Sequence, residues 1–142
     1  MKTLKILLLS SLIFPFILSC NAQNADKKEN TENTIAKEVN VYYFHFTRRC
    51  PTCIAVEEKT NEILKQLYAN EIENGTISFK SYNLDESESK EIAEKVGVSG
   101  QTLLFVKGEE KIDLTSEGFM YARSNPEKLE EKIKETVGKL ML

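Results

Sequence analysis

The chain has 142 residues, which suits one compact domain behind a short targeting segment and is too few for two sizeable cores. Hydrophobic residues make up 41% and charged residues 29% of the sequence, so the chain has enough apolar material to fold. The formal net charge is −3, and the lysines that follow Lys128 alternate with Glu instead of forming a basic stripe. This charge pattern argues against a nucleic-acid partner.

Residues 1–19 have the pattern of a secretory signal peptide. A charged start precedes an apolar run over residues 6–18, and the small Ser19 then stands before Cys20. The run is about 13 residues long and contains Pro15, whereas a membrane-spanning helix needs about 20 residues, so a transmembrane anchor is the weaker interpretation. We therefore expect the leader to be removed.

The four residues that end at Cys20, Ile-Leu-Ser-Cys, resemble the bacterial lipobox. The resemblance implies cleavage before Cys20, lipid modification of Cys20 as the new N-terminus, and a lipoprotein of the bacterial cell envelope whose domain lies in the periplasm or at the outer surface. A free or disulfide-bonded Cys20 is the alternative. Residues 21–34 contain no large apolar side chain, so we expect residues 20–37 to form a flexible tether and residues 38–142 to form the domain.

The first half of the domain predicts a strand, a helix and a second strand. Residues 39–46 are β-branched and aromatic with almost no charge, which is typical of a central strand buried on both faces. Pro51 favours a helix start, and the helix should run to about residue 69 with an inner face of Val56, Ile63, Leu64 and Leu67. After a turn at Asn74-Gly75, residues 77–84 alternate as a strand.

The second half predicts a short helix, a hairpin and a last helix. Ser87 or Ser89 would cap the short helix, and Gly97 would end it in a left-handed conformation. Residues 102–106 and 111–115 should pair as a hairpin. The last helix should be capped by Asn125 and opened by Pro126, with a buried stripe of Leu129, Ile133, Val137 and Leu140.

The order strand, helix, strand, helix, strand, strand, helix predicts an α/β fold with a mixed central sheet flanked by helices. The connection through the first helix should cross over to a parallel strand. The segment 118–121, Gly-Phe-Met-Tyr, has two interpretations: an apolar contact patch for a protein partner, or side chains that fill the core under the last helix.

Two cysteines, Cys50 and Cys53, are three residues apart at the expected helix start. This spacing brings their sulfurs to one side of the first turn, close enough to form or break a disulfide. The helix N-terminus and the preceding Arg48 and Arg49 favour a thiolate at Cys50, which is then the nucleophile. Cys53 would be the more buried, resolving thiol, and exchange of this kind needs no metal or organic cofactor.

A structural disulfide and a metal site are the alternatives for the cysteine pair. A structural bridge gains little from closing so short a loop. Zinc needs four ligands, and His45 is the one other Cys or His left once Cys20 is lipidated. Two-thiolate Cu(I) binding stays open, although Arg48 and Arg49 would oppose a cation.

Three segments resemble the thioredoxin superfamily: residues 44–53 around the Cys-Pro-Thr-Cys motif, residues 82–85, and residues 96–105. The resemblance covers nearly all of the expected domain. It implies a thioredoxin-like fold, thiol–disulfide oxidoreductase activity, and protein disulfides or dithiols with an upstream redox partner as partners. The Pro-Thr dipeptide does not indicate the direction of electron flow.

Within this superfamily, the Tyr-Tyr-Phe-His start and the Arg-Cys-Pro-Thr-Cys motif are similar to the bacterial ArsF family, described as a nitrophenyl-compound nitroreductase subunit. That description implies a redox subunit of a reductase complex. These residues carry no flavin or nitroaromatic motif, so the nitroreductase part gives no functional expectation.

The chain departs from the superfamily pattern at two places. Phe44 stands where the superfamily has a buried acid, and the adjacent His45 is a possible acid or base, although a single His in a strand is more often packed or solvent-facing. The loop that would face substrate, with Gln101 and Thr102, lacks the superfamily's cis-proline. We expect a trans peptide there because a cis bond without proline costs about 3–4 kcal/mol. The resemblance implies that this loss favours metal binding somewhat.

Overall fold

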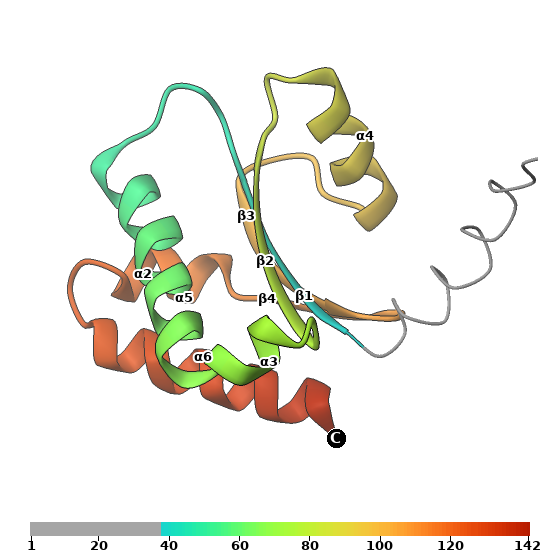
Figure 1. Cartoon of the computed structure of the whole chain (residues 1–142). Helices are drawn as coiled ribbons and strands as arrows, with labels where there is room; N and C mark the ends of the chain where they lie inside the picture. Colours follow the sequence, from blue (N-terminus) through green and yellow to red (C-terminus); the bar gives the residue numbers. More distant parts are fainter. Residues whose placement is uncertain (1–37) are drawn as a thin grey trace, which may run out of the picture.

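A four-stranded sheet forms the centre of the computed structural model, which describes residues 38–142 (Figure 1). The strands are β1 (Val39–His45), β2 (Ile77–Asn83), β3 (Thr102–Lys107) and β4 (Glu110–Asp113). The helices are α2 (Pro51–Leu67), α3 (Ala69–Glu73), α4 (Ser87–Val96), α5 (Thr115–Tyr121) and α6 (Pro126–Met141).

The expected leader 1–19, the lipidated Cys20 and the tether 20–37 lie outside the described residues and stay predictions. Among the helices of residues 38–142, none combines the length and the apolar character needed to span a bilayer.

The strands follow the order β2-β1-β3-β4, so β1 is central. It pairs in parallel with β2, with Val39 opposite Ile77, and antiparallel with β3, with Asn40 opposite Val106. β3 and β4 form the expected antiparallel hairpin around Gly108. The mixed sheet and the parallel connection through α2 are therefore confirmed.

Helices cover both faces of the sheet, which explains why β1 is mostly apolar and aromatic. α4 lies on one face, and α2, α5 and α6 lie on the other (Figure 1). The face under α4 holds a small cluster of Phe44, Leu84 and Ala93. The opposite face holds the main core, to which β1 and β3 contribute Val41, Tyr43, Leu103 and Phe105, α2 contributes Val56 and Leu64, and α6 contributes Leu129, Ile133, Val137 and Leu140.

Two helix ends agree with the sequence expectations. The Asn125 side chain accepts the Lys128 N–H at 3.2 Å, and Pro126 occupies the first turn of α6, where its missing N–H leaves no bond unmade. Gly97 closes α4 with a φ of 77°, a left-handed conformation that glycine adopts without steric cost.

The expected cap of α4 is wrong. Its N-cap is Glu86, which makes no side-chain cap hydrogen bond, because the Glu86 carboxylate accepts from Asn83 instead. Ser87 is already the first residue of the helix, and Ser89 is buried within it.

The bounds of two other elements also differ from expectation. α2 ends at Leu67 rather than near residue 69, because Tyr68 leaves the helical conformation and separates α2 from α3. The second hairpin strand ends at Asp113, whose carboxylate accepts the Thr115 N–H and so favours the start of α5 instead of a longer strand.

The segment 118–121 belongs to α5, a helix that the sequence pattern did not predict. Phe119 and Tyr121 pack partly buried against the main core, as the core-filling interpretation requires. Met120 is 60% exposed, so a single side chain of this segment is available at the surface.

Candidate active site

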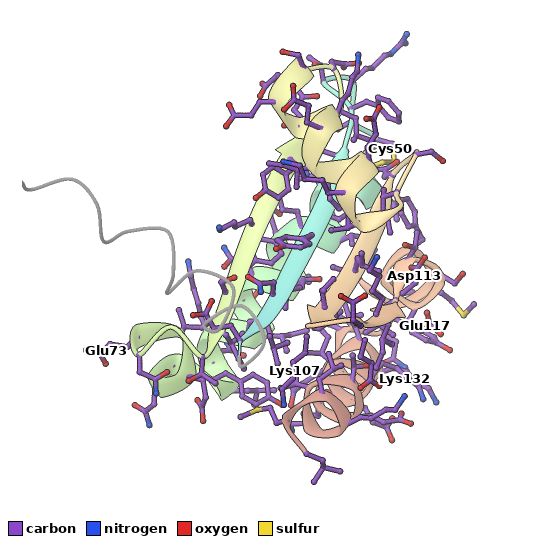
Figure 2. The ribbon with its side chains drawn as sticks, turned by 90° about the vertical axis from the view of Figure 1, so that its right-hand side faces the viewer. Cys50, Glu73, Lys107, Asp113, Glu117 and Lys132 are labelled. Carbon is purple, nitrogen blue, oxygen red and sulfur yellow. A yellow bond between two sulfur atoms is a disulfide. The ribbon has the colours of Figure 1, made fainter. Side chains whose placement is uncertain are left out.

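Cys50 and Cys53 form a disulfide at the N-terminal end of α2 (Figure 2). Their Cα atoms are 5.1 Å apart, within the usual range for a disulfide. Cys50 is exposed, whereas Cys53 is only 6% exposed. The two sulfurs therefore differ in access: one reaches the surface, and the other sits one turn inside the helix.

Cys50 is the N-cap of α2. Its backbone is extended, and its sulfur accepts the Cys53 N–H at 3.3 Å, while Pro51 occupies the first turn. The first turn of α2 contains no acidic residue. The partial positive charge of the helix N-terminus therefore acts on the Cys50 sulfur without a nearby first-turn carboxylate to oppose it, an arrangement that favours a thiolate after reduction.

The loop between β1 and Cys50 is fastened to the end of β2. The Thr47 N–H donates to the Asp85 carboxylate at 2.8 Å, and the Asn83 side-chain amide donates to the Thr47 hydroxyl at 2.9 Å. The backbone hydrogen bond from Thr47 is the main reason why the pKa of Asp85 lies below its ordinary value. These bonds fix the direction from which the chain enters the cysteine motif.

A buried tyrosine joins the cysteine turn to the loop before β3. Tyr43 is fully buried, and its hydroxyl donates to the Cys53 carbonyl at 2.9 Å and accepts from the Gln101 side chain at 2.9 Å. Burial raises the pKa of Tyr43, with the Gln101 hydrogen bond acting in the opposite direction. The phenol therefore keeps its proton and can donate at neutral pH.

Arg49 and Glu57 form an ion pair beside this tyrosine. The Arg49 guanidinium lies 5.9 Å from the centroid of the Tyr43 ring, and its Nη2 atom lies 3.5 Å from the Cys53 carbonyl oxygen. The side chains of Arg49 and Glu57 are 21% and 23% exposed. The positive charge next to the cysteine motif is thus already paired with a carboxylate.

The remaining residues expected at the site lie around this arrangement. Arg48 is exposed. His45 is half-buried with its Nδ1 atom 3.0 Å from the Phe46 carbonyl oxygen, a contact that requires a proton on Nδ1 because a carbonyl only accepts. Thr102 begins β3, and its hydroxyl donates to the Gly100 carbonyl at 3.0 Å. The chemical roles expected for these residues stay predictions.

The structure also places the two departures from the thioredoxin pattern. Phe44 is fully buried in the cluster under α4, on the sheet face opposite the cysteine helix. Residues 38–142 contain no cis peptide bond, so the bonds around Gln101 are trans, as expected.

Two residues of the site, Tyr43 and Glu57, were not singled out from the sequence. Strand alternation could have indicated Tyr43, because neighbouring residues of a strand face opposite sides of the sheet. Tyr43 and Phe44 must therefore lie on different faces, and one of them must face the cysteine helix. Helical spacing could have indicated Glu57, since it lies four residues after Cys53 on the same side of α2.

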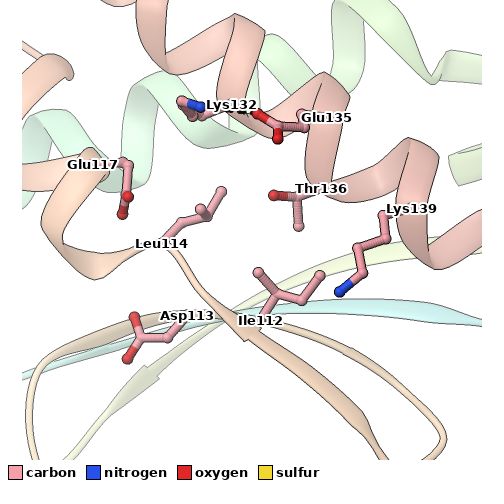
Figure 3. Close-up of a pocket in the computed structure, with 8 residues that line it drawn as sticks. All are labelled: Ile112, Asp113, Leu114, Glu117, Lys132, Glu135, Thr136 and Lys139. Carbon is pink, nitrogen blue, oxygen red and sulfur yellow. Dashed lines mark hydrogen bonds and ion pairs between the residues drawn. The ribbon is translucent and has the colours of Figure 1, made fainter.

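Two cavities lie elsewhere on the described surface. One, of about 260 Å³, is next to the loop that follows β1 and is lined by Phe46, Leu84, Lys90, Ala93, Glu94, Val98 and Ser99. The other, of about 270 Å³, lies between β4 and α6 and brings Asp113 and Glu117 near Lys132 (Figure 3). Figure 2 shows these three residues away from Cys50. Within residues 38–142, no three His, Cys, Asp or Glu side chains gather as metal ligands.

The arrangement of strands and helices is similar to solved thioredoxin structures. Thioredoxin O2 from Arabidopsis thaliana, solved in its oxidised state, has 20% sequence identity and a TM-score of 0.50, and the match covers 75% of this chain and 84% of that one. The chain has a thioredoxin-like fold. Its Cys50–Cys53 pair lies at the N-terminal end of α2, with Cys50 as the N-cap and Cys53 in the first turn.

Two further thioredoxins resemble this thioredoxin-like chain. Thioredoxin from Fasciola hepatica has 20% identity and a TM-score of 0.46, with 78% of this chain and 88% of that chain covered. The germline-specific thioredoxin Deadhead from Drosophila melanogaster has 18% identity and a TM-score of 0.47, with 76% and 86% covered. No protein-family model and no curated protein sequence matches the chain.

Proposed function

We propose that the protein is a thiol–disulfide oxidoreductase in which Cys50 attacks and Cys53 resolves. The observation that carries the proposal is the unequal pair of sulfurs: an exposed one that caps α2, bonded to a nearly buried one in the next turn. An exposed sulfur at a helix N-terminus suits nucleophilic attack on a macromolecular disulfide. The buried partner is shielded from solvent until the first sulfur is engaged.

The proposed cycle begins with both cysteines reduced. The Cys50 thiolate attacks one sulfur of a substrate disulfide, that S–S bond breaks, and the other substrate sulfur leaves as a thiolate and takes up a proton. Cys53 then loses its proton and attacks the Cys50 sulfur, which forms the Cys50–Cys53 disulfide and releases the second substrate thiol. Two electrons pass from the protein to the substrate, and the reverse sequence oxidises a substrate dithiol.

The proposed substrates are protein disulfides or dithiols, and an upstream dithiol or disulfide partner restores the starting state. The exposed apolar side chains of Phe46, four residues before Cys50, and Ile54, directly after Cys53, support a protein substrate. If the protein is the redox subunit of a reductase complex, it would use the same cycle with one fixed partner protein.

A disulfide-exchange assay tests the proposal. The reduced full chain is mixed with a fluorescence-quenched disulfide peptide, alongside the Cys50→Ser and Cys53→Ser variants. Wild type should release the peptide thiols, Cys50→Ser should be inactive, and Cys53→Ser should accumulate the mixed disulfide seen by mass spectrometry. Equal rates for wild type and Cys50→Ser would refute the proposal. Tight uptake of Cu(I) or zinc without exchange would favour a metal-binding module instead.

We also propose that the protein is an envelope lipoprotein anchored through Cys20 and grouped with the ArsF family. The support is the apolar run that ends at Cys20 and the motif residues described above. Mass spectrometry of the mature N-terminus should find an acylated Cys20, and Cys20→Ser should release the protein from membranes. An unacylated mature chain that starts elsewhere would refute the anchor.

A further inference from the structure

The ion pair between Arg49 and Glu57 differs from the others in the molecule. Both of its side chains are less than a quarter exposed, whereas every side chain in the other four ion pairs of residues 38–142 is at least 33% exposed. Surface pairs contribute little, but charges that are partly removed from water interact more strongly. This pair is therefore the one most able to affect a neighbouring group.

The neighbouring group is the cysteine turn. Arg49 directly precedes Cys50, and its Nη2 atom lies 3.5 Å from the Cys53 carbonyl oxygen. Glu57 lies four residues after Cys53, which places it one turn further along the same side of α2. Arg49 is thus adjacent to Cys50 along the chain, and its guanidinium lies beside the first turn of α2, which carries Cys53.

Arg49 and Glu57 form an ion pair with each other and with no other charged side chain among residues 38–142. The aromatic ring of Tyr43 lies beside the guanidinium, and its pKa responds to the charges of both Arg49 and Glu57. Within residues 38–142, α5 and α6 pack near α2 but place no charged side chain in a hydrogen bond or ion pair with either residue. Tyr43 from β1 and the two cysteines of the adjoining turn are titratable groups beside the pair.

Arg49 also has hydrogen-bonding capacity that Glu57 does not use. Its Nε atom is buried and has no hydrogen-bond partner among the described residues. A guanidinium carries five N–H donors and stays charged at every accessible pH. Glu57 therefore opposes the charge of Arg49 without satisfying all of its donors.

We propose that Glu57 is a positioning residue for thiol exchange: by pairing with Arg49, it limits the stabilisation that the arginine gives to the Cys50 thiolate. This inference rests on the proposed oxidoreductase function. Removing the carboxylate leaves the arginine charge uncompensated beside the reduced pair. The Cys50 thiolate then becomes more stable, and the dithiol form gains relative to the disulfide, so the protein becomes a stronger oxidant.

The test measures the pH dependence of alkylation at Cys50 in the reduced full chain, with the modified peptide identified by mass spectrometry. Glu57→Gln should move the alkylation profile to lower pH by about one unit, a roughly tenfold change in the acid dissociation constant. The matched control is Glu58→Gln, which removes the same charge from the adjacent, exposed position of α2. Its profile should stay close to that of wild type.

Two further variants separate electrostatics from structural support. Glu57→Asp keeps the negative charge, so its alkylation profile should match that of wild type. If Glu57 had a purely structural role, Glu57→Gln would change the thermal stability but would not shift the alkylation profile. Arg49→Gln should move the profile to higher pH, and Arg49→Gln with Glu57→Gln should return it toward wild type. This second pair keeps the proposal testable if Glu57→Gln alone fails to fold.

The outcomes distinguish the inference from the function on which it rests. If wild type exchanges disulfides but Glu57→Gln and Glu58→Gln share one profile, the inference is wrong and the function stands. If wild type shows no exchange and Cys50 titrates as an ordinary thiol, both are wrong. A shift confined to Glu57→Gln and reversed in the double variant supports the inference.

Discussion

Gly118 in α5 offers a test of how closely the helix layer packs beside the cysteine helix. A Cβ atom built at this position would lie 3.0 Å from Val56 Cγ1 and 3.4 Å from Leu103 Cδ2. Both neighbours are fully buried, so neither side chain has free space into which to move. Gly118→Ala therefore forces α5 away from α2 or from β3.

Two effects of opposite sign decide the outcome. Alanine is favoured over glycine inside a helix by about 1 kcal/mol. An extra carbon in a packed core costs about 1–3 kcal/mol. Because both close neighbours are held in the main core, we expect the packing cost to win and Gly118→Ala to lower the free energy of unfolding by about 1 kcal/mol.

Gly138 provides the matched control. It lies in α6, is exposed, and a Cβ atom there meets nothing within 4 Å, so Gly138→Ala should gain about 0.5–1 kcal/mol. Urea unfolding of wild type and both variants measures the difference. If Gly118→Ala stabilises the protein as much as Gly138→Ala does, the packing described between α5 and α2 is wrong.

Three further substitutions test single contacts. Tyr43→Phe removes a buried hydroxyl with two hydrogen bonds and should lower the free energy of unfolding in urea by about 1–3 kcal/mol. The control Tyr42→Phe should lower it much less, because the Tyr42 hydroxyl has no hydrogen bond among the described residues. Because the pKa of Asp85 is lowered in the folded state, its stabilisation is present above about pH 4 and is lost as the pH falls through that lower pKa. Asp85→Asn should therefore be less stable than wild type at pH 7 and approach it in acid; a stability difference that does not shrink as the pH falls would contradict this. Asn125→Ala should cost about 1 kcal/mol through the lost cap of α6, while Ser87→Ala should cost nearly nothing because this serine caps no helix; similar melting shifts for both would refute the assignment.

The sequence predicted the elements whose signals are local and strong. β1 is β-branched or aromatic at most of its positions, and α6 has a cap, a first-turn proline and a regular apolar stripe. Gly97 ends α4 as expected, because the residue that closes a helix often takes a left-handed conformation, which glycine adopts most readily. The cysteine pair was recognisable because Pro51 marked the helix start beside it.

The missed features depend on contacts between distant segments. α5 is only seven residues long and contains Gly118, a poor helix former, so its stability comes from packing on α2 and β3 rather than from its own residues. The network at the site was missed for a similar reason. Tyr43 and Gln101 are 58 residues apart, and no periodicity in either segment indicates that they meet.

The position of β1 determines which parts of the sheet open together. Within residues 38–142, β1 has hydrogen-bonded strands on both sides, whereas β2 and β4 each have one neighbouring strand. Backbone amides in a strand with two neighbours exchange with solvent only when a larger cooperative unit opens. Since β1 leads directly into the loop that carries Cys50, fraying at the β4 edge leaves the support of the two sulfurs in place, whereas opening of β2 would also release the hydrogen bonds that join Asn83 and Asp85 to Thr47.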